Sequence, residues 1–170
     1  MGIKHILFDL DGTLLPMDQE KFVKFYMPLL VKAYIESGIK TEPKAFLGAV
    51  WEYMDRLPGM GREAAEKIAT DFYKGAFNEA ICATLPNPLA DKVVKAAKDK
   101  GMDIYLATNP VFPRCATLNR IKWAGLDAED FKWITTYENC GYCKPNLKYF
   151  EQILSRFHLN PPECLMVGND

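Results

Sequence analysis

The sequence lacks an excess of charge of either sign. Its 170 residues include 21 Lys and Arg against 22 Asp and Glu, which gives a formal net charge of −1 at pH 7. Binding to nucleic acid or to an anionic membrane surface generally relies on a strongly basic face, and this composition gives no basis for one. We therefore expect neither a nucleic acid nor a membrane as the partner, and expect a small molecule instead.

Long hydrophobic runs are also absent. No apolar stretch approaches the roughly 20 residues that a helix needs to cross a bilayer. The first residues lead directly into a strand-like run at 3–8, without the pattern of a signal peptide. We expect a cytoplasmic protein.

The cysteines are few and unevenly spaced. There are five, an odd number, which argues against a disulfide framework. Cys140 and Cys143 are the only close pair, and the sequence has no second pair that could complete a four-ligand zinc site. We expect ordinary reduced thiols.

Short apolar runs alternate with longer helical patterns along most of the chain. This alternation is typical of βαβ units and predicts an α/β fold with a Rossmann-like parallel sheet. The strands are expected at 3–8, 104–107, 133–135 and 164–167, and helices at about 88–100, 113–124 and 147–157. In the last helix, one apolar face is predicted from Leu147, Phe150, Leu154 and Phe157.

Residues 16–86 break this rhythm, because they contain helical patterns in series and no convincing strand. Three helices are expected here: one that begins at Asp18, a second at about 43–55 and a third at about 62–81. We therefore predict a helical cap over 16–86, inserted into an α/β core of residues 1–15 and 87–170. Its aromatic side chains are expected to pack the cap helices together, namely Phe22, Phe25, Tyr26, Trp51 and Tyr53.

Polar residues follow each predicted strand. In an open parallel sheet, ligands bind outside the carboxyl ends of the strands. The residues found there are Asp9, Asp11, Thr13, Thr108, Asn109, Lys144, Asn169 and Asp170. An Asp-Gly turn would explain Asp11 and Gly12 but not the rest, whereas carboxylates, a hydroxyl and a cation suit phosphoryl chemistry. Clustered carboxylates repel one another and need a cation, and oxygen ligands of this kind favour Mg²⁺.

The two carboxylates of the first motif are one residue apart. If the first strand continued through Asp11, the alternation of side chains would aim Asp9 and Asp11 to the same side.

Taken in order, these segments resemble the haloacid dehalogenase (HAD) superfamily of phosphohydrolases, in the branch with a helical cap inserted after the first strand. The four motifs read FDLDGT at 8–13, IYLATN at 104–109, KPN at 144–146 and LMVGND at 165–170. The first motif is fairly specific, and the order of all four strengthens the resemblance.

The resemblance implies a role for each residue. Asp9 would be the nucleophile that forms an aspartyl-phosphate, and Asp11 the general acid and then the general base. Thr108 and the backbone N–H of Asn109 would hold the phosphoryl oxygens, and Lys144 would offset the charge shared by Asp9 and the transferring group.

The same resemblance implies a Mg²⁺ cofactor. Its ligands would be the Asp9 carboxylate, the main-chain carbonyl of Asp11 and Asp170. The sequence ends at Asp170, within the fourth motif, and we therefore expect the C-terminal part of the core to be missing from it.

The predicted function is a Mg²⁺-dependent phosphatase that acts on a small phosphorylated metabolite. A phosphomutase of the β-phosphoglucomutase kind would keep the same four motifs and remains an alternative. A non-catalytic or truncated protein of the HAD fold is the other.

Overall fold

The computed structural model describes residues 2–36, 67 and 70–169. The chain divides into two compact units, one of Met1–Asp18 with Thr84–Asp170 and the other of Gln19–Ala83. Each unit is described separately below.

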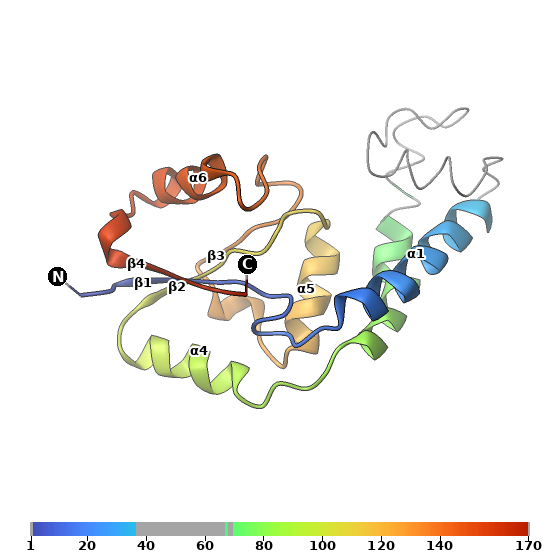
Figure 1. Ribbon diagram of the computed structural model, residues 1–170, viewed down its shortest axis with the longest axis horizontal. Coiled ribbons are helices and arrows are strands. Elements are labelled where there is room, and N and C mark those ends of the chain that lie inside the picture. Colours follow the sequence, from blue (N-terminus) through green and yellow to red (C-terminus); the bar gives the residue numbers. More distant parts are fainter. Residues whose placement is uncertain (1, 37–66, 68–69, 170) are drawn as a thin grey trace. The chain divides into compact units, whose positions relative to one another are not determined.

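A parallel sheet forms the centre of the first unit (Figure 1). The order of its four strands is β3-β2-β1-β4, and every neighbouring pair is parallel. The strands are β1 (His5–Phe8), β2 (Asp103–Leu106), β3 (Trp133–Ile134) and β4 (Cys164–Val167). The predicted α/β fold with a parallel sheet is confirmed.

Three α-helices connect these strands. They are α4 (Ala90–Asp99), α5 (Arg114–Trp123) and α6 (Leu147–Phe157), with short 3₁₀ turns at Ala128–Asp130 and Pro161–Glu163. The largest difference from the predicted bounds is at the start of α4, expected at 88 and found at Ala90. In the turn before this end, the Asn87 side chain accepts a hydrogen bond from the Leu89 N–H at 3.1 Å and donates to the carbonyl of Leu14 at 2.9 Å.

The two faces of the sheet are covered by different helices. Side chains alternate along β1, so that Ile6 joins one hydrophobic cluster and Leu7 the other. The first cluster includes Val94 of α4 and Ile121 of α5, and the second includes Ile153 of α6. Accordingly, α4 and α6 lie on opposite sides of the strands (Figure 1). Both faces are buried along β1 and β2, as is usual for parallel sheets, whereas Leu165 of the edge strand β4 is 45% exposed.

The buried face of α6 differs from the predicted one. Tyr149 and Ile153, four residues apart, have no exposed surface. Phe150, Leu154 and Phe157 pack beside them and are partly buried, whereas Leu147 is 74% exposed. Three of the four predicted residues therefore pack on this face, and the prediction was wrong for Leu147 alone, because the helix meets the sheet through Tyr149 and Ile153.

The second unit contains α1 (Gln19–Glu36), a helical segment at 70–74 and a 3₁₀ helix at Ala76–Ala83. Phe22 and Tyr26 of α1 stack with ring centroids 5.6 Å apart, and the hydroxyls of Tyr26 and Tyr73 are 2.7 Å apart. Phe77 is fully buried against these rings. Aromatic packing thus joins α1 to the segment that returns to the core.

Some predictions for this unit are wrong, and others concern residues outside the described part of the chain. Phe25 is 46% exposed and does not join the aromatic core. The helix expected over 62–81 changes to 3₁₀ geometry after 75. The helix expected at 43–55, with Trp51 and Tyr53, lies outside the described residues. Among the described helices, none is both long enough and apolar enough to cross a membrane.

We predict that Ile153→Ala will lower the free energy of unfolding by about 2–5 kcal/mol, because it leaves a cavity under the sheet. The matched control, Leu147→Ala on the exposed side of the same helix, should change it by less than about 0.5 kcal/mol. Urea unfolding followed by circular dichroism measures both. Similar losses for the two variants would contradict this assignment of the buried face.

Candidate active site

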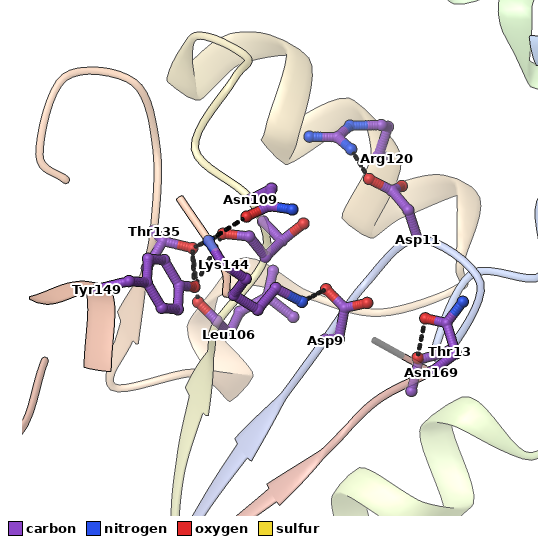
Figure 2. A network of polar contacts seen from close by, with 11 residues as sticks. Asp9, Asp11, Thr13, Leu106, Asn109, Arg120, Thr135, Lys144, Tyr149 and Asn169 are labelled. Atoms are coloured by element: carbon purple, nitrogen blue, oxygen red, sulfur yellow. Dashed lines mark hydrogen bonds and ion pairs between the residues drawn. The ribbon is translucent and has the colours of Figure 1, made fainter. Parts of the chain in front are cut away.

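The predicted site residues gather at the carboxyl edge of the sheet (Figure 2). Asp9 directly follows β1, Thr108 and Asn109 follow β2, and Asn169 follows β4. Lys144 comes from the loop between β3 and α6 and reaches Asp9. The parallel sheet thus brings four distant segments of the chain to one place.

Asp9 forms a buried ion pair with Lys144. The Lys144 Nζ is 3.0 Å from the Asp9 Oδ1, and both side chains are at most 5% exposed. A buried charge without a partner would cost several kcal/mol in lost hydration, and the paired opposite charge offsets that cost. The backbone N–H of Asp9 also donates to the Val167 carbonyl of β4 at 2.8 Å, which fixes the start of the loop.

The environment of Asp9 acts on its protonation in opposite directions. Burial is the largest influence and raises the pKa of the Asp9 carboxyl above its ordinary value. The hydrogen bond and the charge of Lys144 lower this pKa, as does the N–H of Leu10, and the nearby Asp11 raises it slightly further. Lys144 therefore favours the charged carboxylate, the form that can act as a nucleophile.

Thr108 is held in place through its main chain. Its carbonyl accepts hydrogen bonds from the Tyr149 hydroxyl at 2.9 Å and from the Thr135 Oγ1 at 2.5 Å. Thr108 and both donors are buried. Burial also raises the pKa of Tyr149, so its hydroxyl remains a proton donor. These contacts fix the main chain of Thr108 at the end of β2.

Neither Thr135 nor Tyr149 is among the site residues that the sequence predicts. Thr135 carried a signal, because it is the polar residue that ends the third apolar run. Tyr149 carried none, since an aromatic residue within an amphipathic helix is most simply read as part of the core.

Asn109 positions the segment that carries Lys144. Its side-chain Oδ1 accepts a hydrogen bond from the Lys144 N–H at 2.8 Å. The resemblance implied only a role for the Asn109 backbone, so the side-chain contact is an additional finding. It links the end of β2 to the loop before α6.

Asp9 and Asp11 contact different cations. The strand ends at Phe8, and residues 10–15 form a turn in which the Leu15 N–H donates to the Leu10 carbonyl at 2.8 Å. Gly12 adopts a positive φ of 81° in this turn, a conformation that glycine tolerates well. The alternation argument therefore does not apply: Asp9 points toward Lys144, and Asp11 toward Arg120 (Figure 2).

Asp11 forms an ion pair with Arg120 of α5, through its Oδ2 and the Arg120 Nη1. Arg120 has no exposed surface. Nothing in the sequence indicated this contact, because a single arginine on a helix usually lies in solvent.

Oxygen atoms suited to Mg²⁺ lie beside Asn169. With its amide nitrogen turned toward them, the Asn169 side chain is 3.2 Å from the Asp9 Oδ2 and 3.3 Å from the Asp11 carbonyl oxygen. These are two of the three predicted ligands, and both lie within 3.3 Å of the Asn169 side-chain nitrogen. The third, Asp170, lies outside the described residues.

The donor set fits Mg²⁺. The part of the chain that the structure describes contains no group of three His, Cys, Asp or Glu side chains that could hold a metal. Magnesium does not require such a group, because it accepts carbonyl oxygens and usually completes its shell with water and substrate phosphate.

Cys140 and Cys143 are free thiols. Cys140 is buried, and its Sγ lies 3.4 Å from the Tyr142 carbonyl oxygen. Burial raises the pKa of Cys140, which disfavours the reactive thiolate. This agrees with the prediction of ordinary reduced thiols.

The fold and the site together define an α/β protein with an aspartate pair and a buried lysine at the carboxyl edge of a parallel sheet. The family model for haloacid dehalogenase-like hydrolases matches residues 3–170. The chain therefore belongs to the haloacid dehalogenase-like hydrolase family, as its four motifs predicted.

Two relatives with assigned activities match over nearly the whole chain. Pyrophosphatase PpaX from Anoxybacillus flavithermus is 26% identical over 172 residues, which cover 100% of this chain and 76% of the relative. A D-ribitol-5-phosphate phosphatase from Bacteroides thetaiotaomicron is 24% identical over 177 residues, which cover 98% and 83%.

A solved structure supports the fold. The crystal structure of β-phosphoglucomutase from Clostridium difficile superposes with a TM-score of 0.55 at 18% identity, covering 98% of this chain and 76% of that one. At this identity the likeness establishes the shared fold alone.

We predict that Lys144→Met will raise the pKa of the Asp9 carboxyl in the metal-free protein. Methionine keeps much of the side-chain length but removes the charge and the hydrogen bond that favour the carboxylate, so its protonation should begin at a higher pH. ¹³C NMR titration of the labelled aspartate carboxyls measures the midpoint.

The matched control is Lys148→Met, which removes an exposed lysine of α6 that lies over the Tyr142 ring. It should leave the Asp9 midpoint unchanged. An Asp9 midpoint in Lys144→Met equal to that of the unsubstituted protein would contradict the assigned pairing.

Proposed function

We propose that this chain is a Mg²⁺-dependent phosphatase that hydrolyses small phosphorylated metabolites through an aspartyl-phosphate on Asp9. The observation that carries the proposal is the buried Asp9 carboxylate, which is paired with Lys144 through Oδ1 and whose Oδ2, like the Asp11 carbonyl oxygen, lies close to the Asn169 side-chain amide. One oxygen thus faces a fixed cation, and the other lies where a metal would be held. Membership of the hydrolase family supports the same chemistry.

In the first step, a carboxylate oxygen of Asp9 attacks phosphorus. The new bond joins this oxygen to phosphorus, and the bond from phosphorus to the leaving oxygen breaks. Asp11 donates a proton to the leaving oxygen, which departs as an alcohol. Lys144 and the Thr108 hydroxyl offset the charge on the phosphoryl oxygens during transfer.

In the second step, water attacks phosphorus of the aspartyl-phosphate. Asp11, now a carboxylate, accepts a proton from this water, and the bond between phosphorus and the Asp9 oxygen breaks. Inorganic phosphate leaves, and both aspartates return to their initial states. A phosphomutase would differ only in the acceptor, which would be a hydroxyl of the bound substrate.

The residues that would hold Mg²⁺ are Asp9, through its carboxylate, Asp11, through its carbonyl, and Asp170. The ion, when bound, supplies positive charge that stabilises the phosphoryl group during transfer.

We also propose that residues 16–86 form a helical cap on the core of 1–15 and 87–170.

The substrate class is proposed from the relatives. One is named a pyrophosphatase and the other a ribitol-phosphate phosphatase, and the substrates in both names are small phosphorylated molecules. We propose the same class of substrate here.

We predict that the protein will hydrolyse para-nitrophenyl phosphate with Mg²⁺ and that chelation of the metal will abolish this activity. Asp9→Asn should lower kcat by a factor on the order of 10³ or more, because the amide cannot act as the nucleophile. Release of nitrophenol measures the rate. Mass spectrometry of acid-quenched enzyme should detect a phosphorylated peptide containing Asp9.

Asp91→Asn is the matched control, because Asp91 is a partly exposed carboxylate of α4 paired with Lys95. It should retain full activity. Equal rates for the unsubstituted protein and Asp9→Asn would favour the non-catalytic alternative. A panel of sugar phosphates, polyol phosphates and pyrophosphate then tests the substrate class, and an isomerised product without release of phosphate would favour the phosphomutase.

A further inference from the structure

Arg120 is a fully buried arginine beside one of the two aspartates of the site. Its side chain has 0% exposure, although arginine is among the residues least often buried. Burying a guanidinium is costly unless its charge is paired and its donors are used. Its contacts therefore indicate what the residue does.

The guanidinium is held from several directions. Its Nη2 donates to the Thr117 Oγ1 at 3.3 Å, and its central carbon lies 4.3 Å from the centroid of the Phe112 ring. Thr117 in turn donates to the Pro113 carbonyl at 3.4 Å. These contacts fix the arginine on α5, and the Nη1 faces Asp11 (Figure 2).

The ion pair occupies only one oxygen of Asp11. The Oδ2 contacts Arg120, while the buried Oδ1 has no hydrogen-bond partner among the residues that the structure describes. Asp9, by contrast, is paired with Lys144. Each of the two aspartates thus has its own cation, and the buried Oδ1 of Asp11 is unpaired among the described residues.

We propose that Arg120 is the positioning residue for the acid and base function of Asp11. Its ion pair anchors the Oδ2 and leaves the Oδ1 as the oxygen that transfers the proton. This inference rests on the proposed phosphatase function. Fixing a catalytic group in one orientation before reaction lowers the entropic part of the barrier.

A purely structural ion pair would have a different consequence from a positioning one. Loss of a structural contact should lower activity equally for all substrates. Loss of proton transfer from Asp11 should matter most when the leaving oxygen needs a proton. Phenyl phosphate and para-nitrophenyl phosphate make this comparison, because phenolate is a much poorer leaving group than nitrophenolate and the two substrates are otherwise alike.

The test compares kcat/KM for these two substrates in Arg120→Met, which keeps the side-chain length and removes the charge. We expect a loss for phenyl phosphate that exceeds the loss for para-nitrophenyl phosphate by a factor on the order of 10 or more. Arg120→Lys should recover much of the activity lost with phenyl phosphate, because it returns the charge without the forked geometry. Arg114→Met, an exposed arginine on the same helix, should affect neither substrate.

A double-substitution cycle tests whether Arg120 acts through Asp11. In an Asp11→Asn background, Arg120→Met should cause no further selective loss, since the group that it positions is gone. Thr117→Val provides a milder variant that keeps the ion pair and removes one support of the guanidinium. Its loss of kcat/KM should also be larger for phenyl phosphate than for para-nitrophenyl phosphate, by a smaller factor. This variant keeps the test possible if Arg120→Met does not fold.

Equal losses for both substrates, or an undiminished Arg120 effect in the Asp11→Asn background, would overturn the inference and leave the phosphatase proposal intact. Absence of Asp9-dependent turnover in the unsubstituted protein would overturn the phosphatase proposal, and this inference with it.

Discussion

Asp9 and Lys144 are both almost fully buried, and the 3.0 Å contact between them offsets what would otherwise be two expensive isolated charges. The pair joins the end of β1 to a loop that follows β3. Asn109 holds that loop at the Lys144 N–H, so a third segment supports the same contact. If the pair were broken, burial would favour protonation of Asp9 and the site would lose its nucleophile.

The second aspartate has a different cationic partner. Asp11 lies in the turn after β1 and pairs with Arg120 on α5. Two carboxylates in one site repel each other, and separate cations for each reduce that conflict. In the proposed chemistry the two roles differ, because Asp9 has to be ionised to attack phosphorus whereas Asp11 has to exchange a proton in both steps.

Much of the core was predictable because its signals are local. Apolar runs bounded by polar residues predicted the strands, and α6 was found at its predicted bounds of 147–157. Predictions weakened where the surroundings decide which side of an element is buried. Leu147 belonged to the most apolar row of α6, yet it is 74% exposed, because the helix faces the sheet through Tyr149 and Ile153.

The sequence by itself determined the parallel α/β architecture and the order of the four motifs, and with them Asp9, Asp11, Thr108 and Lys144 as site candidates. These follow from residue type and from position at strand ends. Only the tertiary structure decided that Asp11 turns to Arg120 and that Tyr149 supports the Thr108 carbonyl. Such pairings join residues far apart along the chain, and they depend on which helix face the sheet covers and how the turn at Gly12 redirects the backbone, which no local pattern encodes.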